Sequence, residues 1–328
     1  MITTVPRSSE RMSYGVVPAV VFIVAFLAAN PAVGQPLRHD SPRLLFTGDI
    51  LLSRNVEVEL QHRGGSPWNH LHELFYGADW VGGNFEGAVG TASQCVSGKG
   101  PCFAVLESEV ELLKNAGFQA LTVENNHAGD LGAEGRKQTL QALQQAGLLP
   151  IDFENSPRFI DLGDLRIAFI AVTTIPAADG QVQQVPSAEL LEKLLLARRR
   201  ANFVVVSIHW GNELIPWPSE AQRTQAAWLA EHGADLILGH HPHVIQPPEC
   251  VAGIPVFFSL GNHVFDQANP KTKEGLIADC RVSRRLFCRA IGTHTDPGTF
   301  VPRLSGPDSA ANSALAACTP RIKSRSDN

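Results

Sequence analysis

Short apolar runs alternate with amphipathic stretches from residue 43 onward. The runs that predict buried strands are 43–46 (RLLF), 119–123 (QALTV), 203–208 (FVVVSI), 235–238 (DLIL) and 256–260 (VFFSL). The amphipathic stretches that predict helices cover about 108–116, 133–146, 187–199 and 219–233. Strands that alternate with helices of this length indicate βαβ crossovers and therefore an α/β fold.

Turn and cap residues add detail to this pattern. The stretch 159–172 (FIDLGDLRIAFIAV) predicts a hairpin that turns at Gly163-Asp164. Ser108 with Glu111, and Ser219 with Gln222, have the spacing of helix-opening caps. Two last strands near 276–282 and 286–292 predict an antiparallel extension or a second sheet.

The first 34 residues have the pattern of an export signal. Arg7 and Arg11 precede the almost wholly apolar stretch 16–29, and Ala32-Val33-Gly34 offers small residues for cleavage before Gln35. An uncleaved membrane anchor is the alternative, although the stretch is shorter than the roughly 20 residues of a comfortable span. We therefore expect a periplasmic or extracellular protein, with a polar linker over 35–42.

Composition excludes some classes of protein. The chain has 328 residues, of which 44% are hydrophobic and 18% charged, which is ordinary for a globular protein. The net charge of −5 and the absence of a basic stripe argue against a nucleic-acid partner. From about 295 the chain is rich in Ser, Ala and Pro, so 295–328 is expected to be a loosely ordered tail, apart from any anchoring by Cys318.

Six cysteines behind an export signal indicate disulfides. Cys95 and Cys102 flank a Gly-rich loop and are the favoured pair. Cys280 and Cys288 bracket an expected turn, which would leave Cys250 for Cys318, but six cysteines allow 15 pairings and the last two pairs stay open.

Polar residues follow the five predicted strands named above and a sixth predicted strand near 79–83, at the point where each strand ends. The segments are Gly48-Asp49, Asn84-Phe85-Glu86, 124–127 (ENNH), 209–213 (HWGNE), 239–243 (GHHPH) and 261–263 (GNH). Sites in open α/β sheets form beyond the carboxyl ends of strands, so these segments are expected to converge on one crevice. In extended backbone His241 and His243 would point the same way. Imidazole and carboxylate ligands suit a divalent manganese, zinc or iron ion.

These segments resemble the CapA-type family, which is linked to bacterial capsule and poly-γ-glutamate synthesis. The matching segments are GDILLSR (48–54), NFE (84–86), ENNHAGDLG (124–132), HWGNE (209–213), GHHPHVIQ (239–246) and SLGNHVFD (259–266). The family is similar in fold to calcineurin-like metallophosphoesterases. The resemblance covers roughly 43–283 and implies a four-layer α/β/β/α sandwich, and we expect the domain to span 43–294.

The resemblance also implies roles for individual residues. Asp49 matches the first aspartate ligand, and Glu86 stands where the phosphoesterases have a metal-bridging Asp. Asn126 matches the ligand Asn, and His127 the adjacent histidine that acts as general acid. The remaining ligand positions match His209, His241 and His243.

One departure bears on the number of metal ions. The phosphoesterases carry a histidine two residues after the first Asp, where this chain has Leu51. One position would keep Asp49, Glu86 and His243, and the other would keep Glu86, Asn126, His209 and His241. One tightly held metal is therefore expected rather than two.

Four further residues are expected around the site. Arg54 would pair with a phosphate or carboxylate, or form a surface salt bridge. Glu213 would support a ligand histidine, or be a plain exposed Glu. Within the CapA-type pattern Glu124 replaces a small residue and His263 a Phe, either near the site or as tolerated rim substitutions.

Three functions are compatible with these residues. The favoured one is an accessory or processing role in capsule or poly-γ-glutamate-type polymer biosynthesis, with an acidic polymer and membrane-bound synthesis or export proteins as partners. The second is metal-dependent hydrolysis of a phosphoester, with His127 protonating the leaving oxygen. The third is epimerase-like acid/base chemistry on a peptide through His127 or Glu124.

Overall fold

The computed structural model describes residues 1–2, 41–96, 100–296, 298–320 and 322. Contacts divide the chain into two units, 1–38 and 39–328, of which the second carries all the secondary structure discussed below. The predicted signal peptide, apart from residues 1–2, and residues 35–40 of the predicted linker lie outside the described residues. Within the described part of the chain, no helix combines the length and apolar character needed to cross a bilayer.

The first sheet has eight strands and a mixed topology. Its members are β1 (Arg43–Ile50), β2 (Trp80–Phe85), β5 (Ala120–Thr122), β6 (Leu149–Ile151), β15 (Asn262–Val264), β16 (Glu274–Val282), β17 (Leu286–Thr295) and β18 (Pro302–Pro307). The order is β18-β17-β16-β1-β2-β5-β6, with β15 also paired to β1. The strands β1, β2, β5 and β6 are parallel, whereas β16, β17 and β18 form the predicted antiparallel extension.

The second sheet has six strands in the order β12-β13-β10-β9-β8-β7. These are β7 (Arg158–Leu162), β8 (Leu165–Thr173), β9 (Phe203–His209), β10 (Leu236–His240), β12 (Glu249–Val251) and β13 (Ile254–Phe257). Four of them, β8, β9, β10 and β13, are parallel. Buried parallel strands are apolar on both faces, which explains why β9 and β10 read as continuous apolar runs.

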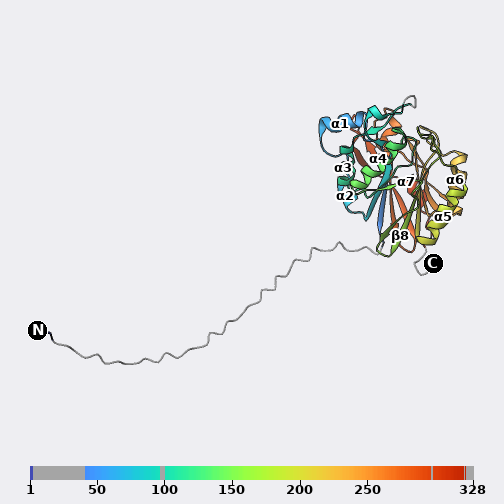
Figure 1. Ribbon diagram of the computed structural model, residues 1–328. Helices are drawn as coiled ribbons and strands as arrows, with labels where there is room; N and C mark the ends of the chain where they lie inside the picture. The colour runs from blue at the N-terminus through green and yellow to red at the C-terminus, as the bar shows by residue number, and fades with distance from the viewer. Residues whose placement is uncertain (3–40, 97–99, 297, 321, 323–328) are drawn as a thin grey trace. The chain divides into compact units, whose positions relative to one another are not determined.

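Helices cover the outer face of each sheet, except for the last helix, which packs against the core between the sheets. The helices are α1 (Asn55–Arg63), α2 (His72–Tyr76), α3 (Glu107–Ala116), α4 (Gly132–Gln145), α5 (Ala188–Arg200), α6 (Glu220–Glu231) and α7 (Ser309–Leu315). One core joins α2, α3 and α4 to the first sheet, and another joins α5 and α6 to the second. Figure 1 shows α1 to α4 on one side of the sheets and α5 and α6 on the other. The predicted four-layer α/β/β/α sandwich is confirmed.

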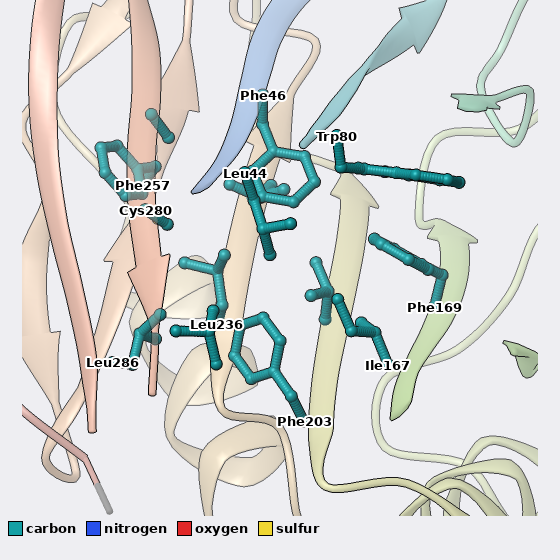
Figure 2. Close-up of a cluster of buried hydrophobic side chains, with 14 of the residues drawn as sticks. Leu44, Phe46, Trp80, Ile167, Phe169, Phe203, Leu236, Phe257, Cys280 and Leu286 are labelled. Atoms are coloured by element: carbon teal, nitrogen blue, oxygen red, sulfur yellow. The ribbon is translucent and has the colours of Figure 1, made fainter. Parts of the chain in front are cut away.

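The innermost core lies between the two sheets. Figure 2 shows Leu44 and Phe46 of β1 facing Phe169 of β8, Phe203 of β9 and Leu236 of β10. Side chains from both sheets interdigitate here, which fixes the sheets face to face. The carboxyl ends of their central parallel strands are thereby held side by side.

Short elements complete the domain. They are the strand pairs β3 (Ala88–Val89) with β4 (Ala104–Val105) and β11 (Ile245–Gln246) with β14 (Ser259–Leu260), and the 3₁₀ turns 92–94 and 270–273. The hairpin turn at Gly163-Asp164 is confirmed, because Leu162 pairs with Leu165. The cap of Ser219 with Gln222 is also confirmed. The cap predicted at Ser108 is wrong, because α3 begins one residue earlier, at Glu107, and Ser108 lies inside the first turn.

The C-terminal segment is more ordered than expected. Residues 302–307 form β18 on the edge of the first sheet, and 309–315 form α7. Ala311 and Leu315, four residues apart on one face of α7, are buried in the core between the sheets. A Ser/Ala-rich composition concealed this small apolar face, so the expectation of a loose tail from 295 does not hold for these residues.

All three disulfides form, including the two pairs that the sequence left open. Cys95 is bonded to Cys102, Cys250 to Cys318 and Cys280 to Cys288. The Cys280–Cys288 bond joins directly opposed residues of β16 and β17. The Cys250–Cys318 bond ties the segment after α7 to β12.

Candidate metal centre

The ends of four central strands meet where the two sheets pack together. In the first sheet Asp49 of β1 lies opposite Asn84 of β2, two residues before Glu86. In the second, His209 of β9 lies opposite His240 of β10. The polar segments predicted to converge therefore do so, because parallel strands end at the same edge of a sheet.

Asp49 links the two sheets. Its Oδ1 accepts a hydrogen bond from Asn84 Nδ2 at 2.8 Å, and its Oδ2 accepts one from the backbone N–H of His241 at 3.2 Å. Oδ1 also lies 3.2 Å from His240 Nδ1, and Oδ2 lies 3.4 Å from His243 Nδ1. A fully buried carboxylate of the first sheet thus holds the histidine loop of the second.

An extended backbone was expected for that loop from the sequence, but the loop forms a turn. His241 has φ 95° and His243 has φ 58°, both in the left-handed region that non-glycine residues seldom adopt. Such residues cost about 1–3 kcal/mol each and are found where the surrounding structure fixes them, often at functional sites. Both rings reach one cluster through a strained turn and not through strand alternation.

Two glycines let the strand ends approach this closely. A Cβ on Gly48 would lie 1.9 Å from the carbonyl oxygen of Gly261, and one on Gly239 would lie 2.0 Å from that of Phe258. Both contacts are far below the closest that real Cβ atoms make. Gly48 and Gly239 immediately precede Asp49 and His240, so glycine is required at the base of both donor segments.

Asn126, His209 and His241 form one side of the cluster. Asn126 Oδ1 lies 2.8 Å from His209 Nε2, which in turn lies 3.1 Å from His241 Nδ1. Three heteroatoms with lone pairs, one amide oxygen and two ring nitrogens, converge there. The resemblance assigned these three residues, together with Glu86, to one metal position.

Glu86 and His127 form the other side. Glu86 is fully buried, and neither of its oxygens has a hydrogen-bond partner among the described residues. Its Oε1 lies 3.6 Å from His243 Nε2 and 4.0 Å from His127 Nε2. A buried carboxylate without hydrogen bonds is costly, and a bound cation would satisfy it.

His127 is held by two neighbours. Its Nδ1 lies 2.8 Å from Asp130 Oδ2, and its ring stacks on Phe103 with centroids 3.6 Å apart. The same Asp130 oxygen accepts a hydrogen bond from the backbone N–H of Phe103 at 2.7 Å. This framework leaves His127 Nε2 as the atom that faces Glu86.

Burial keeps two of the histidines neutral. Burial, followed by the neighbouring His241, holds the pKa of His209 well below its usual value. Burial, followed by the neighbouring His243, lowers the pKa of His241 to about 4. Both are therefore neutral at pH 7, the form in which imidazole binds a metal.

Two carboxylates, Asp49 and Glu86, and the imidazole of His243 change one another's pKa. Burial raises the pKa of Glu86 well above its usual value. Burial alone would also raise the pKa of Asp49, but hydrogen bonds and charge from His240 and His243 outweigh it and hold that pKa well below the usual value. Burial likewise opposes the charge on His243, yet Glu86 and Asp49 raise its pKa to about 9.

The residues present fit a divalent cation. Two sets of three donors have ligand atoms within 4.8 Å of one another, namely Asp49 with Glu86 and His209, and Glu213 with His241 and His243. Carboxylate oxygens with imidazole nitrogens suit zinc, manganese or iron. Asn126 adjoins the first set through His209, so every predicted ligand lies in one cluster.

Arg54 and Glu213 lie beside the cluster. Arg54 Nε forms an ion pair with Asp266 at 3.2 Å, and its guanidinium lies 5.2 Å from the centre of the Phe103 ring. This contact is a salt bridge within the chain, which was the alternative to the predicted pairing of Arg54 with a bound anion. Glu213 is exposed, and its carboxylate lies among the donors and not behind them.

Glu124 and His263 are engaged elsewhere in the fold. The two oxygens of Glu124 accept hydrogen bonds from Phe153 N at 3.0 Å and from Gln183 Nε2 at 3.1 Å. His263 is buried against Phe75 of α2, with ring centroids 6.2 Å apart. Successive residues of β15 point to opposite faces, so His263 enters the core while Asn262 faces the cluster.

The sequence did not single out His240 and Asp130 as site residues. His240 ends β10 and contacts Asp49, a placement that its register with His209 in the neighbouring strand could have indicated. Asp130 follows His127 by three residues, a spacing that brings two side chains together in a tight turn. Asn262 was also missed, and its Oδ1 lies 2.9 Å from His243 Nδ1.

Known proteins match this chain over most of its length. A family model described as bacterial capsule synthesis protein PGA_cap matches residues 43–267. The PGA biosynthesis protein CapA of Bacillus subtilis (strain 168) is 31% identical over 298 residues, which cover 85% of this chain and 78% of the relative. The capsule biosynthesis protein CapA of Bacillus anthracis is 31% identical over 284 residues, covering 79% and 69% respectively.

A solved structure has a similar fold. A phosphatase of Mycoplasma pneumoniae superposes with a TM-score of 0.55 and 14% identity, covering 79% of this chain and 96% of that one. At this identity the likeness concerns the fold alone.

Proposed function

The chain belongs to the bacterial capsule synthesis protein family (PGA_cap), and from that premise we propose that it acts in the biosynthesis of a capsule or poly-γ-glutamate-type polymer. The role is an accessory or processing one, exerted at a divalent metal site. One observation carries the metal site: the fully buried Glu86, which has no hydrogen bond among the described residues, lies within 4.8 Å of donor atoms of Asp49 and of the neutral His209. The proposed partners are an acidic polymer and the membrane-bound proteins that make or export it.

The proposed location is outside the cytoplasm. Three disulfides among six cysteines support an oxidising compartment. The predicted export signal agrees with this location.

The test is genetic complementation with polymer as the readout. In a strain that makes the polymer, deletion of the gene should abolish or strongly reduce the polymer, and the wild-type gene should restore it. A gene carrying Asp49→Ala with His241→Ala should fail to restore it while the protein accumulates normally. Full rescue by this variant would contradict a role for the metal site.

A second candidate, phosphoester hydrolysis, is favoured by the Asp130–His127 pair. When bound, a divalent metal would lower the pKa of a water molecule and supply hydroxide as the nucleophile. Asp130 would hold Nδ1 of His127 and stabilise the charged ring. Nε2, which faces Glu86 at 4.0 Å, would give its proton to the leaving oxygen.

Turnover of aryl phosphate mono- and diesters separates the two candidates. A hydrolase should show metal-dependent turnover that falls by about 100-fold or more in His127→Ala. The absence of turnover across manganese, zinc and iron, together with binding of poly-γ-glutamate, would favour the accessory role.

A further inference from the structure

The loop between β9 and α6 is fastened to the turn that carries His241 and His243. The backbone N–H of Leu214 donates a hydrogen bond to the carbonyl oxygen of Pro242 at 2.9 Å. Pro242 separates the two histidines, and Leu214 directly follows Glu213. One backbone hydrogen bond therefore brings the Glu213 position beside both imidazoles.

A buried amide fixes the rest of this loop. Gln246 is fully buried, and its Nε2 donates hydrogen bonds to the carbonyl oxygens of Ile215 at 2.9 Å and Trp217 at 3.1 Å. Its Oε1 accepts one from Gln222 Nε2 at 2.8 Å. The loop that carries Glu213 is thus held at two points to Gln246, three residues after His243, and Gln222 of α6 fixes Gln246 in turn.

The backbone on both sides of this contact is strained. Leu214 has φ 61°, and the two histidines also have positive φ. Three non-glycine residues in the left-handed region, in two loops joined by a hydrogen bond, indicate a geometry that the structure maintains at a cost. The result of that geometry is the approach of one carboxylate to two imidazoles.

The donor atoms then meet the requirements of a cation site. A carboxylate oxygen of Glu213 and ring nitrogens of His241 and His243 lie within 4.8 Å of one another. Nδ1 of His243 faces Asn262 Oδ1 and Asp49, which leaves Nε2 as its ligand atom. Glu213 is exposed whereas both histidines are buried, so this set opens to solvent.

We propose that Glu213 is a metal ligand and forms, with His241 and His243, an outer divalent-cation position beside the inner set of Asp49, Glu86 and His209. The inference rests on the proposed function, because both positions belong to the same metal site. It gives that site two cations, where the sequence favoured one, and places one of them within reach of an acidic ligand from solution.

The experiment is a titration of the metal-free full chain with Mn²⁺, followed by calorimetry and by electron paramagnetic resonance. The wild-type chain should bind two Mn²⁺ ions with different affinities. Glu213→Gln should weaken one of them by at least about tenfold and leave the other unchanged, since loss of even a supporting group commonly costs that much. Glu213→Asp, which keeps the carboxylate, should recover part of the loss.

Glu134→Gln is the matched control, because that carboxylate is 85% exposed on α4 and lies 4.0 Å from Lys137. It should bind Mn²⁺ as the wild type does, and circular dichroism should show all variants folded. Two wild-type affinities in Glu213→Gln, or a single Mn²⁺ in the wild type, would overturn the outer position alone. A wild-type chain that binds no Mn²⁺ would overturn the metal site of the proposed function as well.

Discussion

Two buried histidines have opposite surroundings: His243, which contacts Asn262 of β15, and His263, the next residue of that strand. They are 2% and 1% exposed. His243 contacts Asn262, Asp49 and Glu86, and the two carboxylates raise its pKa to about 9. His263 has no hydrogen bond on either ring nitrogen among the described residues, and burial lowers its pKa to about 3.

The difference shows that burial alone does not mark a functional histidine. Burial opposes the charged form in both cases, so the partners decide the direction in which each ring titrates. Asn262 contacts His243, and the next residue of β15 is His263, so one step along a strand separates a polar cluster from an apolar core. Substitutions on the two sides should therefore have effects of different kinds.

The largest effect is expected from His241→Ala with His243→Ala. The double variant should lose metal affinity by at least about 100-fold, because both substitutions remove ligand atoms. At a metal concentration about 100 times the Kd, the bound ion adds about 2.7 kcal/mol to the free energy of unfolding. Adding a chelator should therefore lower the Tm of the wild type but not of the double variant, as measured by calorimetry.

His263→Phe is the control for this comparison and should keep the wild-type metal content. If it lost the metal as the double variant does, the contrast between the cluster and the core pocket would be wrong. Metal content is measured by elemental analysis of the purified chains.

The next effect is a change in pH dependence in His263→Phe. The folded pKa of His263, about 3, lies below the unfolded value of 6.5, so between these pH values the unfolded chain binds more protons. The wild type should therefore lose stability as the pH falls below 6.5, by about 2 kcal/mol at pH 5. His263→Phe should remove this part of the slope in denaturant unfolding at pH 7 and pH 5. An unchanged slope would contradict the prediction.

The smallest effect is expected at Asp279, a buried carboxylate with strong partners. Burial raises its pKa, but Arg43 and Arg289, at 2.9 and 2.7 Å, outweigh burial and lower it. Because the pKa of Asp279 is lower in the folded chain, its charge stabilises the fold at pH values above the unfolded pKa. This stabilisation is lost as the pH falls through the folded pKa. Asp279→Asn should therefore cost about 1 kcal/mol at pH 7 and little near pH 2.

Urea unfolding of Asp279→Asn at both pH values measures this difference. Glu134→Gln, a change at an exposed carboxylate, should be neutral throughout. An equal cost at both pH values would mean that Asp279 acts through packing and not through its charge.

Much of this molecule follows from local sequence. The apolar runs predicted the central strands, and the polar residues after them predicted the cluster that contains Asp49, Glu86 and His209. The strands were predicted because buried parallel strands are apolar on both faces, and the cluster because parallel strands end at one edge of a sheet. The hairpin at Gly163-Asp164 follows from turn chemistry alone.

The features that the sequence did not predict all depend on the direction of a side chain or on packing between segments far apart in the sequence. Strand alternation sends His263 into the core, and the sequence gives no sign of which face that is. The left-handed turn at His241 and His243 and the hydrogen bond from Leu214 to Pro242 bring Glu213 into the donor set, and both arise from contacts between loops. The helix at 309–315 was missed because its apolar face consists of little more than Ala311 and Leu315.

The glycines at 48 and 239 have a consequence for how this centre can vary. Each lies against the carbonyl of a neighbouring segment, directly before a donor residue. Close packing of the main chain, and not the donor side chains, therefore fixes where the donor residues lie. A single methyl group at either position would displace a whole strand end and misplace several ligands at once, while every ligand stayed chemically intact. The geometry of this site thus depends as much on two residues without side chains as on the residues that supply the ligand atoms.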